Sequence, residues 1–309
     1  MSKVLDLRET IPPPEEVIQA GLDGSLILFI GAGVSRLLEL PSWNELALCV
    51  LKDLRNQSLL NYSEIDQLKS LDAKTQLSIA KLIAEQENIE LNFREHLSGK
   101  TEGDSIYKAI NDIGCCCVTT NYDELLSPRY IKNRDGSETT VSVNRVAERE
   151  KFFAKLLNEP GTVVHLHGSI SKPKTLVVST KDYLEHYDNA HVQAFLGELF
   201  EKKTVVFLGY GMEESEVLEH ILRRGLVRET SDRRRFAVQG FFRSQQPLYE
   251  KLHNYYEKSF GVHLLGYVRD YENYSGLETI LKLWVSKIII QPPPLQDDFE
   301  FMNEVLGDE

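Results

Sequence analysis

Short apolar runs rich in β-branched and aromatic residues alternate with segments of helical periodicity along most of the chain. This alternation is typical of a mainly parallel sheet covered by helices on both faces. Several runs are apolar at consecutive positions, as strands buried on both faces are. The chain is therefore predicted to be an α/β protein with a doubly wound, Rossmann-like sheet. Its strands are expected at residues 25–30, 115–119, 162–166, 176–178, 204–208, 236–239 and 262–265.

A long helical stretch separates the first two predicted strands. Apolar spacings of three and four predict helices there at residues 43–55, 74–85, 91–97 and 106–113. We therefore expect a helical subdomain at about residues 51–108. An Asp-Gly pair at 135–136 predicts a hairpin, followed by a helix at 146–157. The expected organisation is an N-terminal segment at 1–23, the α/β domain at 24–290, and a proline-rich acidic tail or linker at 291–309.

The charge balance limits the partners that this chain is expected to have. It carries 35 Lys and Arg against 47 Asp and Glu, a net charge of −12, which argues against a protein that wraps nucleic acid. Arg233, Arg234 and Arg235 are read as a solvated loop or, alternatively, as a docking point for an acidic partner or nucleic acid. Nucleic acid is therefore expected only through a partner, if at all.

Neither membrane insertion nor secretion is expected. No apolar run approaches the roughly 18 residues needed to cross a bilayer. The N-terminus lacks the basic and apolar regions of a secretory signal, so a cytoplasmic location is expected. The four cysteines, Cys49, Cys115, Cys116 and Cys117, form neither a disulfide framework nor a metal-binding spacing.

A glycine-rich turn follows the first predicted strand. It consists of Gly31, Ala32, Gly33, Val34 and Ser35. Glycines let the backbone approach a phosphate without Cβ atoms, and the following amides can donate hydrogen bonds to the anion. The turn is thus a candidate nucleotide-binding loop, with a plain tight turn as the alternative. Arg36 replaces the third glycine of the dehydrogenase fingerprint, which argues against ordinary nicotinamide-dependent hydride transfer.

Three further motifs lie at the carboxyl ends of predicted strands, where the loops of such a sheet place ligand contacts. They are Thr119-Thr120-Asn121-Tyr122-Asp123-Glu124, His165-Leu166-His167-Gly168-Ser169 and Phe207-Leu208-Gly209-Tyr210-Gly211. The structural alternatives are a capping box from Asn121 to Glu124, a satisfied core histidine and a plain strand-to-helix turn. His165 and His167 also lie on one face of a strand, so a metal site completed by carboxylates from elsewhere is a competing interpretation.

In this order, the sequences GAGVS, TTNYD, HLHG and FLGYG resemble the sirtuin fold, and specifically the sirtuin-like NAD hydrolases of bacterial antiphage defence systems. The resemblance covers roughly residues 24–287. It implies that NAD binds at the first turn, with its phosphates and ribose near Gly31, Ala32, Gly33, Val34 and Ser35. The nicotinamide ribose would approach Thr119, Asn121 and Asp123. The adenosine side would be supported by Gly209, Tyr210 and Gly211.

His167 matches the catalytic histidine of sirtuins, but other parts of the chain depart from the sirtuin deacylases. The two CxxC pairs that hold their structural zinc are absent, and Leu40-Pro41-Ser42-Trp43 occupies the region of their proline-aspartate-phenylalanine-arginine stretch. These departures weaken the interpretation as a protein deacylase. They leave NAD cleavage compatible with the residues present.

We therefore expect hydrolysis of NAD to nicotinamide and ADP-ribose without a metal ion. Asn121 would orient the ribose, because its amide both donates and accepts hydrogen bonds. His167 would accept a proton near neutral pH, while Asp123 would either stabilise positive charge or only cap a helix. The alternatives are a non-catalytic module that senses NAD or ADP-ribose and gates a partner, and a protein deacylase.

The resemblance also implies a biological role, that of a toxic effector in a prokaryotic antiphage, or abortive infection, system. An enzyme that destroys a central cofactor needs control. A homo-oligomer, a regulatory protein partner, or both are therefore expected. The outer faces of the helical subdomain and the tail at 291–309 are the segments expected to serve that control.

Overall fold

The computed structural model describes residues 6–97, 105–132, 137–212, 217, 219–221, 234–269 and 275–291. The strands of its main sheet are β1 (Leu26–Ile30), β2 (Cys116–Thr119), β5 (Asn144–Val146), β6 (Thr162–His165), β7 (Thr204–Leu208), β8 (Arg235–Phe241) and β9 (His263–Val268). They lie parallel in the order β5-β6-β2-β1-β7-β8-β9. The predicted doubly wound α/β fold is confirmed.

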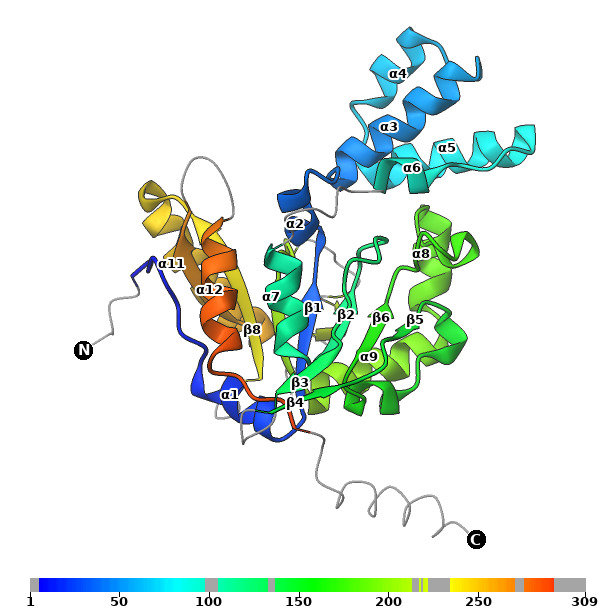
Figure 1. Ribbon diagram of the computed structural model, residues 1–309. Coiled ribbons are helices and arrows are strands. Elements are labelled where there is room, and N and C mark those ends of the chain that lie inside the picture. The colour runs from blue at the N-terminus through cyan, green and yellow to red at the C-terminus, as the bar shows by residue number, and fades with distance from the viewer. Residues whose placement is uncertain are drawn as a thin grey trace, which may run out of the picture.

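Helices cover both faces of this sheet (Figure 1). One face carries α1 (Glu15–Leu22), α7 (Ser105–Ile113) and α12 (Ser275–Val285), and the other carries α8 (Thr180–Tyr187), α9 (Ala190–Lys202) and α11 (Gln246–Phe260). Successive strand residues alternate between the two cores: Ile27 and Phe29 pack on one side, Leu28 and Ile30 on the other. Because side chains on both faces of the sheet are buried, the central strands are apolar at consecutive positions.

A separate helical layer stands beyond the carboxyl ends of the strands (Figure 1). It comprises α3 (Trp43–Asn56), α4 (Tyr62–Leu68), α5 (Ala73–Glu87) and α6 (Phe93–Leu97). These helices bury their own apolar cluster, which also includes Tyr122 from the loop after β2. Ser42 and Glu45 form the capping box that starts α3. Helix α7, the last helix between β1 and β2, packs on the sheet instead of joining this layer. The division of the chain into domains stays a prediction.

Two of the predicted elements are wrong. Residues 176–178 form no strand, because Val177 donates its N–H to His167 O and the chain then turns into α8, capped by Ser179. The predicted helix at 146–157 is instead the end of β5 followed by two 3₁₀ turns, η2 (Arg149–Lys151) and η3 (Ala154–Asn158). The apolar residues that suggested a helix there, Phe152, Leu156 and Leu157, are buried against the sheet from these turns.

The smaller features fall as follows. Strands β3 (Tyr130–Lys132) and β4 (Glu138–Thr140) pair antiparallel on either side of the predicted hairpin turn, whose Asp-Gly pair lies outside the described residues. Arg233 and the tail beyond Gln291 lie outside them too. Arg234 donates to Lys202 O, and Arg235 donates to the carbonyls of Phe200 and Phe260. Among the helices that the structure describes, none is both long and apolar enough to cross a membrane.

The sheet reverses its winding between β1 and β7. The chain leaves β1 on the β2 side and returns later on the other side as β7. In open α/β sheets, ligands bind at such a point, beyond the carboxyl ends of the strands. The two strands at this point both run into glycine-containing turns, one at 31–35, where α2 (Ala32–Ser35) begins, and one at 209–211.

These two turns are locked together backbone to backbone. Gly31 N donates to Leu208 O at 2.9 Å, and Gly33 N donates to Gly209 O at 2.8 Å. A Cβ on Gly33 would lie 2.7 Å from Gly209 O, and a Cβ on Gly209 would lie 2.4 Å from Val34 N. The glycines are thus required by the approach of one turn to the other.

Gly209→Ala is expected to lower the free energy of unfolding by more than the ~1–2 kcal/mol that a left-handed backbone costs a residue with a Cβ. The added methyl would also force the two turns apart. Gly261→Ala is the matched control, because its φ of 61° is close to the 59° of Gly209, whereas its Cβ would meet only the Arg235 side chain, at 3.5 Å. Urea unfolding measures the free energy of unfolding of both variants. Equal losses in Gly209→Ala and Gly261→Ala would contradict the proposed contact between the two turns.

Candidate functional site

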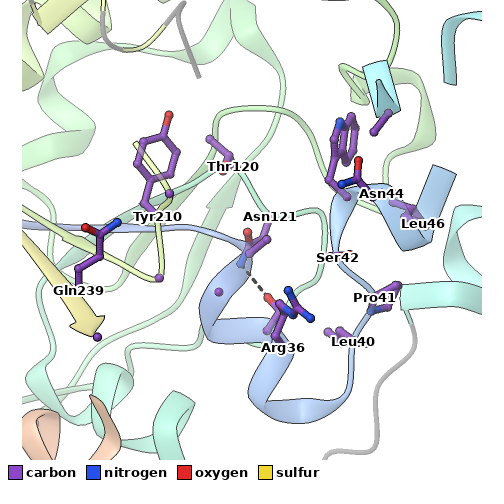
Figure 2. A pocket seen from close by; sticks show the side chains of 18 of the residues that line it. Arg36, Leu40, Pro41, Ser42, Asn44, Leu46, Thr120, Asn121, Tyr210 and Gln239 are labelled. Atoms are coloured by element: carbon purple, nitrogen blue, oxygen red, sulfur yellow. Dashed lines mark hydrogen bonds between the residues drawn. The ribbon is translucent and has the colours of Figure 1, made fainter. Parts of the chain in front are cut away.

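A cavity of about 800 Å³ lies at the carboxyl edge of the sheet, at the point where the winding reverses. Its size is within the range of about 300–1,000 Å³ that small-molecule sites occupy. Both glycine turns line it, and so do the loops after β2 and β6, the ends of β8 and β9, and residues of α3 and α5. Figure 2 looks into this cavity. The sheet and the helical layer therefore enclose one site between them.

Most of the predicted site residues line this cavity. They are Ala32, Gly33, Ser35, Asn121, Asp123, His167, Gly209, Tyr210 and Gly211. Three predicted residues are not among its lining. Gly31 packs against Tyr210, Val34 is buried in the core beside the sheet, and the Thr119 hydroxyl donates to Ile30 O at 2.9 Å. These three residues therefore support the first glycine turn from the protein interior and do not face the cavity.

Ser35 joins the first motif to the second. Its hydroxyl accepts a hydrogen bond from Asn121 Nδ2 at 2.8 Å and donates one to Asp123 Oδ2 at 2.9 Å. The Tyr107 hydroxyl, from α7, lies 2.9 Å from the same Ser35 oxygen. All four side chains are buried. A buried and connected polar network of this kind fixes side-chain orientation, because a broken bond would leave a desolvated polar group unpaired.

Asn121 is held on several sides. Its backbone N–H donates to Thr119 Oγ1 at 3.0 Å, and Nδ2 also donates to Gly31 O at 3.2 Å. No described residue donates a hydrogen bond to its Oδ1, and the residue lines the cavity. The acceptor atom of the amide is therefore the one that can meet a ligand (Figure 2).

The alternative of a helix cap in this motif is wrong. Residues 121–129 contain no helix, so neither Asn121 nor Asp123 caps one. Glu124 instead accepts hydrogen bonds from the hydroxyls of Ser169 and Ser171. Asp123 accepts from Ser35, from Tyr107 and from the backbone N–H of Leu125. Burial raises the pKa of Asp123, although these hydrogen bonds act in the opposite direction.

His167 lies just beyond the end of β6, in a turn that requires the glycine after it. Gly168 has a φ of 86°, and a Cβ there would lie 2.2 Å from Thr175 O. His167 Nε2 lies 2.8 Å from the Tyr187 hydroxyl, and Nδ1 lies 3.5 Å from that of Tyr183. Burial lowers the pKa of His167 well below its ordinary range, and the positive charge of Lys74 acts in the same direction. The imidazole is therefore neutral at neutral pH.

The two histidines of the HLHG motif do not converge. His165 ends β6 and places Nδ1 3.2 Å from Asn121 O, whereas His167 contacts the tyrosines of α8. The one group of metal-ligating side chains found among the described residues is His253, Glu257 and His263, on α11 and β9. None of these three lines the cavity. The described residues thus supply no third ligand to a metal at His165 and His167.

Several residues of the site were not anticipated from the sequence. Tyr107 and the pair Tyr183 and Tyr187 lie on amphipathic helices, where aromatic residues at helical spacing usually belong to a core. Lys74, at the start of α5, places its Nζ 4.0 Å from the centre of the Tyr183 ring. The one available signal was the spacing of Tyr183 and Tyr187, which puts both on one face of α8.

Residues 116–263 match the family model of the SIR2-like domain. The match supports a sirtuin-like domain in this chain. It begins at β2 and includes Asn121, His167 and Gly209, while the first glycine turn, at 31–35, precedes it. Domains of this family are typically NAD-dependent enzymes, which suggests an NAD-related enzymatic function for the cavity.

The neutral histidines beneath the cavity predict a loss of stability in acid. Burial lowers the pKa of His186 to about 4, whereas an unfolded histidine titrates near 6.5. Below pH 6.5 the unfolded chain therefore binds a proton that the folded chain does not, and the free energy of unfolding falls with falling pH. For His186 the loss is about 2 kcal/mol between pH 7 and pH 5.

His186→Phe should reduce the difference in unfolding free energy between pH 7 and pH 5 by that amount. The exposed His191, in His191→Phe, provides the control and should leave the difference unchanged. Urea unfolding of both variants and the wild type at the two pH values measures it. A wild-type pH difference retained in His186→Phe would show that this histidine is charged in the folded protein.

Proposed function

We propose that this protein hydrolyses NAD to nicotinamide and ADP-ribose in the cavity between the sheet and the helical layer. The observation that carries the proposal is the Ser35 network. It ties the first glycine turn to Asn121 at the point where the sheet reverses its winding. Asn121 itself lies in the segment, residues 116–263, that matches the SIR2-like domain. The neutral His167 lines the same cavity.

The reaction breaks the bond between the ribose C1′ and the pyridinium nitrogen, and nicotinamide leaves with the bonding electron pair as a neutral molecule. The sugar then carries positive charge, which a water oxygen relieves by bonding to C1′. The proton of that water needs an acceptor. Because His167 is neutral, one nitrogen of its imidazole has a free electron pair and can accept this proton.

Asn121 serves the reaction by orientation. The Ser35 hydroxyl and Gly31 O hold its Nδ2, so its Oδ1 is presented to the cavity to accept a hydrogen bond from a ribose hydroxyl or from the attacking water. Asp123 acts through Ser35 and Tyr107 in this proposal, as a positioning residue. Loss of such positioning costs catalysis even where the chemistry is unchanged.

The test is to mix the purified protein with NAD and to measure the release of nicotinamide. Asn121→Ala and His167→Ala should each lower kcat/KM by at least the ~10²-fold typical of lost acid–base or positioning help. His191→Ala is the control, because His191 is exposed on α9. Wild-type rates in both variants, with the fold intact by circular dichroism, would remove these residues from the mechanism.

The same experiment separates the alternative functions. NAD binding without turnover in the wild type would indicate a non-catalytic module that senses NAD or ADP-ribose. Turnover that depends on an added acyl-lysine peptide would indicate a protein deacylase.

We expect turnover to be independent of metal ions. The proposed chemistry uses only Asn121, His167 and water, and His165 and His167 point to different partners. Dialysis against a chelator should therefore leave the rate of nicotinamide release unchanged. Stoichiometric zinc in the purified protein, lost together with activity, would favour a metallohydrolase.

In the cell we propose the role of a cytoplasmic toxic effector in a prokaryotic antiphage, abortive infection system, held in check by assembly or by a regulatory partner. The outer faces of α5 and α8, on which Leu82 and Leu184 are 57% and 70% exposed, are the surfaces proposed to meet a second subunit or a partner. Light scattering beside the NAD assay, over a range of protein concentrations, tests this control. An active monomer whose specific rate is independent of concentration and of any partner would contradict it.

A further inference from the structure

Arg36 stands where the first glycine turn meets the cavity. It follows Ser35 directly, begins the 3₁₀ turn η1 (Arg36–Leu38), and its exposed side chain lines the cavity near Asn121 (Figure 2). No hydrogen bond or ion pair of its guanidinium occurs among the residues that the structure describes. Its charge contributes to lowering the pKa of Glu45, whose carboxylate is held chiefly by hydrogen bonds to Ser42.

The other charged side chains around the cavity are already engaged. The carboxylate of Asp72 accepts from the backbone and hydroxyl of Thr75 at the start of α5, and Asp123 belongs to the Ser35 network. Lys74 lies over the ring of Tyr183, and the Arg269 guanidinium lies 4.3 Å from the centre of the Phe242 ring. Arg36 is therefore the lining cation best able to turn to an incoming anion.

The backbone of the turn is less able to bind an anion than the sequence suggested. Gly31 N and Gly33 N donate to the carbonyls of Leu208 and Gly209, and Val34 N donates to Gly31 O. The N–H of Arg36 donates to Ala32 O. Helix α2 is only four residues long. Because most of these amides are spent inside the protein, a diphosphate at this turn needs a side chain to balance its charge.

We propose that the guanidinium of Arg36 binds the diphosphate group of a dinucleotide or of a nucleoside diphosphate sugar in this cavity. The inference rests on the proposed function in that it takes NAD and ADP-ribose as the ligands. Guanidinium groups suit this task, because their fork of N–H donors matches two phosphate oxygens at once. Arg36 thereby takes over the anion binding that free backbone amides supply in other glycine-rich loops.

The test is the binding of ADP-ribose, measured by isothermal titration calorimetry, which needs no catalysis. A hydrogen bond to a charged group contributes about 1.5–3 kcal/mol, so Arg36→Ala should weaken the binding roughly 10-fold to 100-fold. Arg36→Lys should restore part of it, because the charge remains and the fork is lost. Lys52→Ala, which removes an exposed cation from α3 outside the cavity, is the control and should bind as the wild type does.

Two further readouts distinguish charge recognition from a structural role. The affinity of the wild type should fall with added salt more steeply than that of Arg36→Ala. Adenosine, which has no phosphate, should bind both proteins equally, and their melting temperatures should agree. Equal weakening of ADP-ribose and adenosine, or unchanged ADP-ribose binding in Arg36→Ala, would overturn the inference.

Absence of ADP-ribose binding to the wild type would overturn it as well. Failure of the proposed function has a different signature. If ADP-ribose binds through Arg36 but the wild type releases no nicotinamide from NAD, hydrolysis is contradicted and the assignment of Arg36 stands.

Discussion

The contact on which the rest of the site depends is the hydrogen bond from Gly33 N to Gly209 O, at the reversal point of the sheet. It brings the turn after β1 against the turn after β7 with no room for a Cβ on either glycine. This lock fixes the start of α2 and therefore the position of Ser35 on its first turn. Ser35 then holds Asn121 and Asp123 from the neighbouring loop, so one backbone contact sets the geometry of two motifs.

The same contact changes how such a turn can bind a nucleotide. Glycines in a βα turn are usually explained by the approach of a phosphate. Here the close approach is made by another part of the protein, and amides that would face an anion are used in holding it. In the function proposed above, recognition passes to side chains: Ser35 holds the amide of Asn121, which is proposed to orient the ribose, and Arg36 is proposed to supply the charge. The amides of Gly31 and Gly33, which could bind an anion, are thus used to hold the fold together.

Sequence reasoning predicted the sheet well, because the buried strands β1, β2, β6 and β7 are continuous apolar runs that end at glycines or polar motifs. It failed at 146–157, where apolar spacing suited a helix and the chain used 3₁₀ turns to cover the same core. It placed Asn121 and His167 at one cavity, because the carboxyl ends of parallel strands share an edge. It did not find Tyr107 or Tyr187. The spacing of Tyr183 and Tyr187 indicates a shared helix face, but what that face and Tyr107 contact depends on how α7 and α8 pack.

The central claim is that Ser35 and Asn121 act as one unit in cleaving NAD. A double-mutant cycle tests it most directly, with kcat/KM for NAD measured in wild type, Ser35→Ala, Asn121→Ala and the double variant. If Ser35 acts by holding the amide, the double variant is no slower than the slower single variant, because contacting residues of one network are not additive. Losses that multiply, or a wild type that releases no nicotinamide, would contradict the account.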